Sequence, residues 1–474
     1  MTSSWFPVSL PPDTWLRNAQ APAAIIDGIS LPANAEGLAR LDLRIANGRI
    51  ADLVPAGSAS EGIDLDRGQL WPCFVDAHVH LDKTQTWPRQ PNPDGTHAGA
   101  KSAVIADRAK HYSEADIEPR FEFGLRCALA HGTAAIRTHL DSYWPGARAH
   151  WAVFRRLRDA WAGRIALQAV SITTLERFRG DDGVALANEV AASGGILGMT
   201  TTGEGGSASS PEFQELLDRF FTLAEERGLA MDLHLDETGD PSSHALNAVA
   251  RTAIRRGFNK PIQVGHVCSL SVQTEAEALA TIRLCADAGL SVVNLPMCSM
   301  YLQGRTASQT PRWRGITMVH EFHAAGVPVS FASDNCRDPF YAYGDYDMVE
   351  VYREAVRIAQ LDHPFGAWTA SVTDTPASAC GFAVMGRIRI GAPADLVLFR
   401  ARSMTELLAR PQSDRVVLRN GKPLNAPLPD FRRPIAHKKT ARRRMAYSIV
   451  RGSSYGRWGV AAGAHAGCPV PCVE

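Results

Sequence analysis

The chain has 474 residues, of which 45% are hydrophobic and 21% are charged. Its 50 Lys and Arg against 49 Asp and Glu leave a formal net charge of +1. This balance excludes an intrinsically disordered chain and argues against a nucleic-acid partner. No apolar run is long enough to span a membrane, and the N-terminus lacks a basic segment followed by an apolar one. No membrane association and a cytoplasmic location are therefore expected.

Residues 1–70 are predicted to form short strands and turns. The segment LARLDLRIANGRIADLV alternates apolar and polar residues around Asn47-Gly48, which is a strong hairpin signal. We expect this region to be the N-terminal part of a β-sandwich.

Residues 71–368 have a different pattern, in which short Val- and Ile-rich runs alternate with helix-like stretches such as PEFQELLDRFFTLAEERG. Eight such runs are candidate strands: LWPCFVDAHVH, TAAIRTHLD, RIALQAVSI, GGILGMTTT, LAMDLHLDE, PIQVGHVC, LSVVNLPM and VPVSFASDN. Apolar strands alternating with helices predict an α/β fold with a parallel sheet covered on both faces. Eight strands fit a (β/α)8 TIM-like barrel, although the periodicity alone also allows an open doubly wound sheet.

Residues 369–428 return to a strand-rich pattern, in MGRIRIGAPADLVLF and SDRVVLRNGKPL. We expect this region to be the C-terminal part of the β-sandwich, paired with residues 1–70. Residues 429–474 begin with the basic run RRPIAHKKTARRR and are predicted to be a disordered tail rather than a phosphate-binding arm. The first seven of the 9 Cys form no CxxC pair, so they are predicted to be buried, reduced thiols.

Ligand-type residues recur at the ends of four predicted strands. His78 and His80 stand two apart, so their side chains share one face of a strand. Three later strands end in His234, His266 and Asp334. Nitrogen and oxygen donors at one mouth of a barrel suit a divalent transition metal. The alternative, a set of surface histidines, does not explain why they coincide with strand ends.

Two further side chains carry candidate chemistry. Glu237, three residues after His234, can lean over a metal site and move a proton between water and a ring nitrogen. Gln168, which we place near the end of the third strand, offers the donor and acceptor that would read a heterocycle edge. Binding of the Gln168 amide to neighbouring backbone is an equal alternative. His139 and Asp141 either support the metal ligands or simply pack at the second strand end.

Several segments, in order, resemble the cytosine deaminase branch of the amidohydrolase superfamily: FVDAHVHLDKTQT, RTHLD, LQAV, LHLDET, GHVCS, YLQGR…PRWRGIT and SDN…DPFYAYG. The resemblance covers residues 40–425. It implies a barrel with a small composite β-sandwich built from both chain ends.

The resemblance also implies roles for individual residues. It places the metal ligands on His78, His80, His234 and Asp334, and the metal is Fe²⁺ or Zn²⁺ in such enzymes. It implies that Glu237, His266 and Asp334 are catalytic and that Gln168 binds the ring. The implied reaction is attack of a metal-bound hydroxide on the ring carbon that bears an amino group, with release of ammonia.

Four positions bear on the substrate. Asn335 stands where the cytosine enzymes have an acidic residue, which removes a charge and adds two donors. Phe340 replaces a Trp, and His97 stands where a Leu would cover the ring. A lysine at the position of Lys83 resembles the members of the superfamily that act on triazine rings. A salt bridge with Asp82 would explain the presence of this lysine equally well. All four are predicted to bind substrate.

The expected function is hydrolytic deamination of a small pyrimidine-like heterocycle, cytosine or a close analogue. Alternatives are an ammelide-type triazine, isocytosine or creatinine. RIALQAVSI and GGILGMTTTGEGG contain no Lys to bridge two ions, and Glu204 falls beyond the strand, so one metal ion is expected. A catalytically silent scaffold would be expected to lose these residues. Relatives of this kind often self-associate, which predicts a homo-oligomer.

Overall fold

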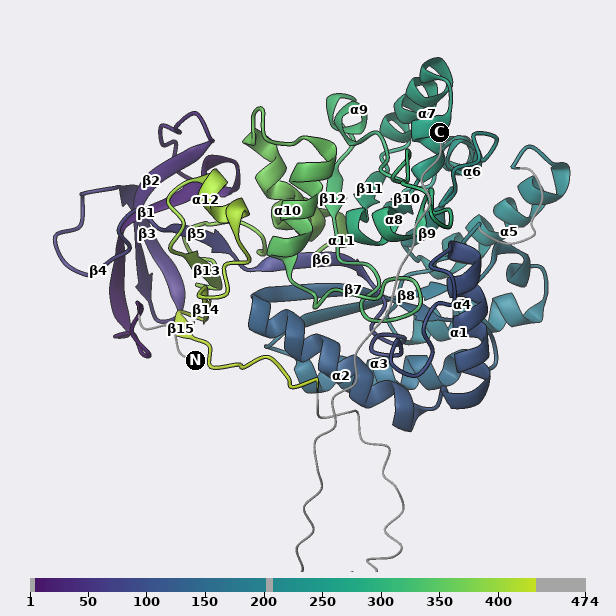
Figure 1. Cartoon of the computed structure of the whole chain (residues 1–474), viewed down its shortest axis with the longest axis horizontal. Coiled ribbons are helices and arrows are strands. Elements are labelled where there is room, and N and C mark those ends of the chain that lie inside the picture. Colours follow the sequence, from purple (N-terminus) through teal and green to yellow (C-terminus); the bar gives the residue numbers. More distant parts are fainter. Residues whose placement is uncertain (1–4, 202–207, 432–474) are drawn as a thin grey trace, which may run out of the picture. The chain divides into compact units, whose positions relative to one another are not determined.

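A computed structural model describes residues 5–201 and 208–431, all of which belong to one compact unit. Figure 1 shows two groups of strands, one formed by β1–β5 with β13–β15 and the other by β6–β12 with the surrounding helices. The predicted tail at 429–474 lies outside the described residues from 432 onward, as does Glu204.

The two chain flanks form one mixed sheet of eight strands in the order β15-β14-β13-β5-β1-β2-β3, with β4 paired to β1. Its strands are β1 (Asp13–Pro22), β2 (Leu38–Ala46), β3 (Arg49–Pro55), β4 (Ile63–Asp64), β5 (Gln69–Pro72), β13 (Leu396–Phe399), β14 (Val416–Arg419) and β15 (Lys422–Pro423). The predicted hairpin is confirmed, because β2 and β3 pair antiparallel across Asn47-Gly48. The predicted pairing of the two flanks is also observed, between β5 and β13.

The second group contains two parallel sheets, β6-β7-β8 and β12-β11-β10-β9. Its strands are β6 (Phe74–Val79), β7 (Thr133–Asp141), β8 (Ala166–Ile172), β9 (Met231–Leu235), β10 (Ile262–His266), β11 (Ser291–Asn294) and β12 (Val329–Phe331). Single bridges link the sheets at both junctions, from Val79 to Asp334 and through Ile196, Leu197 and Thr200. All eight predicted segments therefore occur in parallel order, with the fourth present as bridges rather than as a strand.

Helices and short 3-10 turns follow these strands. The helices are α1 (His97–His111), α2 (Glu114–His131), α3 (Ala147–Trp161), α4 (Asp181–Ala192), α5 (Pro211–Arg227), α6 (Ala245–Arg256), α7 (Glu275–Asp287), α8 (Pro296–Leu302), α9 (Val319–Ala324), α10 (Met348–Ala359), α11 (Asp374–Cys380) and α12 (Met404–Ala409). The 3-10 turns are η1 (Ala23–Ile25), η2 (Leu175–Phe178), η3 (Cys268–Val272) and η4 (Gly366–Val372). Helix α5 begins at Pro211 after the capping Ser210, and Gly228 follows its last residue as the C-cap.

Burial follows the strand pattern. All residues of β6, β7, β9 and β10 are buried, as expected of parallel strands covered on both faces. The seven described cysteines are free and buried, which confirms that prediction. Among the residues described, no helix combines the length and the apolar character needed to cross a membrane.

Two sequence predictions of strand position were wrong. MGRIRIG does not form a strand, and only Ile388 makes a single bridge, to Ile26. Residues 70–72, assigned to the first barrel strand, belong to β5 in the flank sheet, and β6 begins at Phe74. The interruption at Cys73 is not marked by any turn residue in the sequence. The domain boundaries at 70, 368 and 428 stay predictions.

Candidate metal centre and pocket

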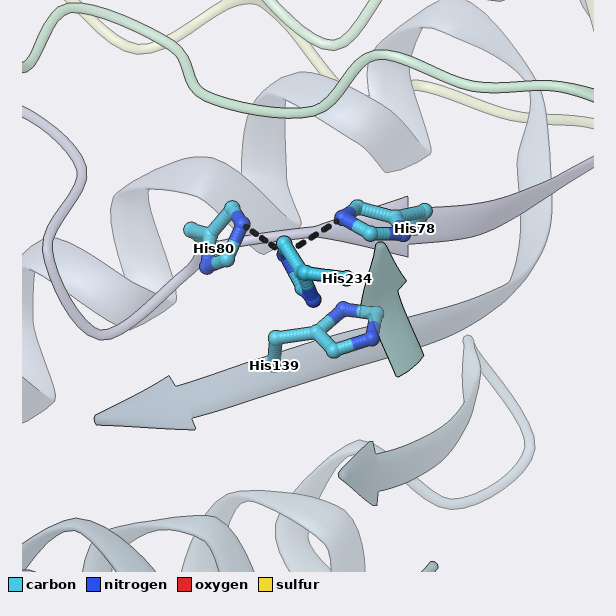
Figure 2. Close-up of side chains that lie close together, drawn as sticks. All are labelled: His78, His80, His139 and His234. Atoms are coloured by element: carbon cyan, nitrogen blue, oxygen red, sulfur yellow. Dashed lines mark hydrogen bonds between the residues drawn. The ribbon is translucent and has the colours of Figure 1, made fainter. Parts of the chain in front are cut away.

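The histidines predicted to bind a metal lie together at the C-terminal ends of the parallel strands. His78 and His80 come from the end of β6, and His234 comes from β9. Nε2 of His78 lies 3.0 Å from Nε2 of His234, which lies 3.3 Å from Nε2 of His80. Figure 2 shows these rings converging, with His139 of β7 beside them.

Asp334 completes this group. The segment after β12 is held against β6 because the backbone N–H of Asp334 donates to the carbonyl oxygen of His78 at 2.9 Å. Oδ1 of Asp334 then lies 3.2 Å from Nε2 of His80 and 3.7 Å from Nε2 of His78. The structure thus brings the four predicted metal ligands together.

These distances fit a tetrahedral metal ion. A zinc ion about 2.1 Å from each ligand separates two ligand atoms by about 3.4 Å at a tetrahedral angle. Neither carboxylate oxygen of Asp334 has a hydrogen-bond partner among the described residues, although its side chain is only 1% exposed. A buried carboxylate without donors is costly unless a cation compensates it. The donor set and its spacing therefore suit one divalent cation.

The electrostatics of the cluster agree with this fit. Burial, together with neighbouring cationic groups, lowers the pKa of His78, His80 and His234 well below the usual value. The three imidazoles are therefore neutral at pH 7 and keep a lone pair for a metal. Burial, with the charge of Glu237, raises the pKa of Asp334 well above its usual range.

Gly265 makes space for the cluster. A Cβ atom at this position would lie 2.9 Å from Cε1 of His78, which is closer than side-chain packing allows. The glycine before His266 in GHVCS is thus required by the imidazole that it faces.

His139 is the residue whose role the sequence left undecided. Its ring centroid lies 3.9 Å from that of His78, and its ligand atoms fall within 4.8 Å of those of His78, His80 and His234. Nε2 of His139 also lies 3.3 Å from Oδ1 of Asp232, a fully buried carboxylate. The alternation His139, Asp141 at the end of TAAIRTHLD was the available signal, since side chains two apart on a strand share a face.

Glu237 and His266 flank the cluster. Oε1 of Glu237 lies 3.6 Å from Nδ1 of His266, and Oε2 lies 3.4 Å from Nε2 of His97. Burial raises the pKa of Glu237, but the nearby His266, His97 and Lys83 outweigh it and bring the pKa to about 2. An ionised carboxylate in this position can accept a proton.

A pocket opens over the cluster. Eight of the residues predicted to form the site line it: His80, His234, Glu237, His266, Lys83, His97, Asn335 and Phe340. Helix α1 forms an apolar wall with Val104 and Ile105. The expected substrate residues other than Gln168 thus share one cavity.

The structure does not bring Gln168 to this pocket. Gln168 is the third residue of β8, not near its end, and Ile172 and Thr174 reach the pocket instead. Its Oε1 accepts from Nε of Arg137 at 3.0 Å, and its Nε2 donates to the carbonyl oxygen of Cys380 at 2.8 Å. Buried Arg137 needs this acceptor, so the Gln168 amide is committed within the protein.

Lys83 pairs with Asp141 rather than with Asp82. Its Nζ lies 3.4 Å from Oδ1 of Asp141, whose Oδ2 is 2.7 Å from Nη2 of Arg108. Asp82 instead accepts from Nδ1 of His150 at 2.6 Å. Nζ of Lys83 also lies 5.1 Å from the centre of the Phe340 ring, which lines the pocket. The Lys83 ammonium group is therefore at the pocket while it is paired with Asp141.

Asp236, beside Glu237, has a structural role. Its carboxylate accepts from the backbone N–H groups of Ala245 at 3.0 Å and Leu246 at 2.9 Å, and so caps the start of α6. We expect Asp236→Ala to lower the free energy of unfolding by about 3 kcal/mol, because it leaves buried donors unpaired. Denaturant unfolding would measure this change.

Asp240→Ala is the matched control, since Asp240 caps an exposed turn at Ser242. Its expected cost is below about 1 kcal/mol. Equal stability of the two variants would contradict a structural role for Asp236.

The chain was compared with known proteins. The family model described as "Amidohydrolase family" matches residues 168–452. A curated protein of Rhizobium rhizogenes named pterin deaminase is 50% identical over 422 residues, covering 88% of this chain and 95% of that protein. N-isopropylammelide isopropyl amidohydrolase of a Pseudomonas species is 24% identical over 373 residues, covering 77% of this chain and 88% of that protein.

Solved structures show a shared fold. The crystal structure of 5-methylcytosine deaminase from Klebsiella pneumoniae liganded with 5-fluorocytosine has a TM-score of 0.72 at 24% identity, covering 86% of this chain and 97% of that one. N-isopropylammelide isopropylaminohydrolase from Burkholderia multivorans has a TM-score of 0.68 at 26% identity, covering 87% of this chain and 98% of that one.

Proposed function

Because the chain belongs to the amidohydrolase family, we propose that it is a metal-dependent deaminase of a pterin, the 2-amino-4-oxopteridine ring. The observation that carries this proposal is the relative named pterin deaminase, 50% identical over 95% of its own length. The reaction replaces the amino group by an oxygen atom from water and releases ammonia. We also propose that the eight strand segments close into a TIM-like barrel.

A pterin contains one of the rings that are expected from the sequence as alternatives to cytosine. Its pyrimidine half is isocytosine, one of the expected alternatives, in which the amino-bearing carbon lies between two ring nitrogens. Val104 and Ile105 on the pocket wall offer apolar surface for a second fused ring.

The proposed metal ligands are His78, His80, His234 and Asp334, which hold one ion, Zn²⁺ or Fe²⁺. A divalent ion bound there lowers the pKa of coordinated water to about 7, which supplies a nucleophile at neutral pH. The side chains of the protein supply the remaining functions.

Glu237 is the proposed proton carrier. With a pKa of about 2, it is ionised before reaction, so it accepts a proton from the attacking water and delivers it to the adjacent ring nitrogen. His266, 3.6 Å from Glu237, orients the water, and Asp334 passes the second proton of that water to the departing amino group, which leaves as ammonia. Lys83 and His97 offer donors to ring acceptors, and Phe340 packs against the ring face.

An ammelide-type triazine is the second candidate. Lys83, which lines the pocket, and the relative named N-isopropylammelide isopropyl amidohydrolase favour it. That relative is 24% identical, against 50% for the pterin deaminase, and the pterin is therefore preferred.

Ammonia release from pterin, isocytosine, cytosine and ammelide, by protein of measured metal content, tests the ring assignment. We expect kcat/KM for pterin to exceed that for cytosine by at least about a hundredfold, because cytosine lacks the second ring and the contacts that this ring would make with the pocket wall. If the protein turned over cytosine or ammelide at the same rate as pterin, the pterin assignment would be overturned and the deaminase chemistry would stand.

A further inference from the structure

Asn335 lines the pocket directly after the proposed metal ligand Asp334, and it is 3% exposed. Its Nδ2 donates to Oδ2 of Asp338 at 2.6 Å. In the described part of the chain, the hydrogen bond that its Oδ1 accepts comes from the Cys298 thiol, at 3.9 Å. A thiol is a weak donor, so the carbonyl oxygen of Asn335 keeps its capacity to accept a hydrogen bond.

Asp338 fixes which way the amide points. It is fully buried, and its Oδ1 accepts from the backbone N–H groups of Phe340 at 2.8 Å and Tyr341 at 3.2 Å. An ionised carboxylate only accepts, so its Oδ2 requires a donor. Rotating the Asn335 amide by half a turn would place its oxygen against the carboxylate oxygen, which is repulsive. The NH₂ group of Asn335 is therefore committed to Asp338.

This geometry decides which half of the Asn335 amide is left for a ligand. The sequence indicates that Asn335 brings two donors to the site, but the structure engages its NH₂ group with Asp338 through one hydrogen bond and leaves the carbonyl oxygen as the acceptor at the pocket. We infer that Asn335 selects rings that present an N–H group at this edge, and that Asp338 is the residue that positions it. The inference rests on the proposed function, in that the pocket holds a heterocyclic ring. Lactam rings such as pterin and isocytosine carry such an N–H group, whereas 2-aminopyrimidine has only acceptor nitrogens in its ring.

Asp338→Asn is expected to reverse the direction of the hydrogen bond between residues 335 and 338 while it keeps the size and shape of the side chain at position 338. The N–H groups of Phe340 and Tyr341 still require an acceptor, so they hold the oxygen of the new amide where Oδ1 now lies. Its NH₂ group then faces Asn335, which must turn its own oxygen inward and its NH₂ group toward the pocket. Asn335 then offers a hydrogen-bond donor to the ring in place of an acceptor.

The test measures the dissociation constants of isocytosine and 2-aminopyrimidine by calorimetry, with metal-loaded enzyme. Wild type is expected to prefer isocytosine, and Asp338→Asn is expected to reduce that preference at least about tenfold, since a hydrogen bond is exchanged for an unpaired donor. Asn335→Leu, which removes the amide at similar size, is expected to reduce it similarly and covers the case in which Asp338→Asn does not fold. For both variants the effect on pterin turnover is expected in KM rather than in kcat.

Asp347→Asn is the matched control. Asp347 also accepts a backbone N–H, from Val349 at 3.0 Å, but it pairs with Arg415 away from this pocket. Its preference between the two rings is expected to equal that of wild type. An unchanged preference in folded, metal-loaded Asp338→Asn and Asn335→Leu would overturn the inference. If wild type does not turn over pterin, but its ring preference and the reduction of that preference in the variants are observed, only the proposed reaction would be overturned.

Discussion

Glu237→Gln is expected to lower kcat by about a thousandfold, because general acid–base catalysis contributes about a hundredfold to ten-thousandfold and an amide cannot carry the proton. The carboxylate lies against His97 and His266 but outside the proposed ligand set, so the variant should keep its metal. Steady-state ammonia release and elemental analysis of the same preparation measure both quantities.

The size match between Glu and Gln makes this substitution informative. The pocket volume and the contact with His97 are nearly preserved, so KM is expected to change little. Full activity in Glu237→Gln would remove this residue from the mechanism. Loss of metal together with activity would instead show that Glu237 stabilises the cluster.

His78→Ala is expected to lower metal affinity by more than about a hundredfold and to abolish turnover. Even residues that only support a ligand contribute about tenfold to a hundredfold to metal affinity, and a direct ligand contributes more. Nε2 of His78 lies 3.0 Å from that of His234 and 3.7 Å from Oδ1 of Asp334, at the centre of the proposed set. Competition with a chromophoric chelator measures the affinity.

His320→Ala is the control for this substitution. His320 is exposed, and its Nε2 bonds to the carbonyl oxygen of Ala359, away from the cluster. It is expected to keep wild-type metal affinity. Unchanged metal content in His78→Ala would overturn the ligand assignment.

The positions of the proposed ligands were predictable from the sequence because strand periodicity and parallel strand order decide them. The HxH pair at His78 and His80 puts two side chains on one face, and parallel strands bring their C-terminal ends to one edge. The Asn47-Gly48 hairpin is also predictable, since the turn itself requires residues that tolerate positive φ.

Features that depend on neighbours across the fold were not predictable. The run RIALQAVSI does not mark where the strand ends, so Gln168 was placed too close to the mouth. Its partner Arg137 lies on a different strand. The partner of Lys83 proved to be Asp141, 58 positions along the chain, rather than its neighbour Asp82.

The polarity of the substrate edge illustrates the same limit. A sequence shows that Asn335 carries an amide, which both donates and accepts. Which half faces the pocket depends on Asp338, whose carboxylate is itself oriented by two backbone N–H groups of the following turn. Side-chain identity gives the chemistry that is available, and packing decides which part of it a ligand meets.

Ammonia release from pterin, measured as metal-free protein is titrated with Zn²⁺ or Fe²⁺, decides whether the protein is a metal-dependent deaminase. We expect negligible turnover without metal and a linear rise that levels off at about one ion per chain, with one ammonia released for each ring converted. Equal turnover by metal-free protein would contradict this proposal. So would a fully loaded protein that releases no ammonia from pterin or from the related rings.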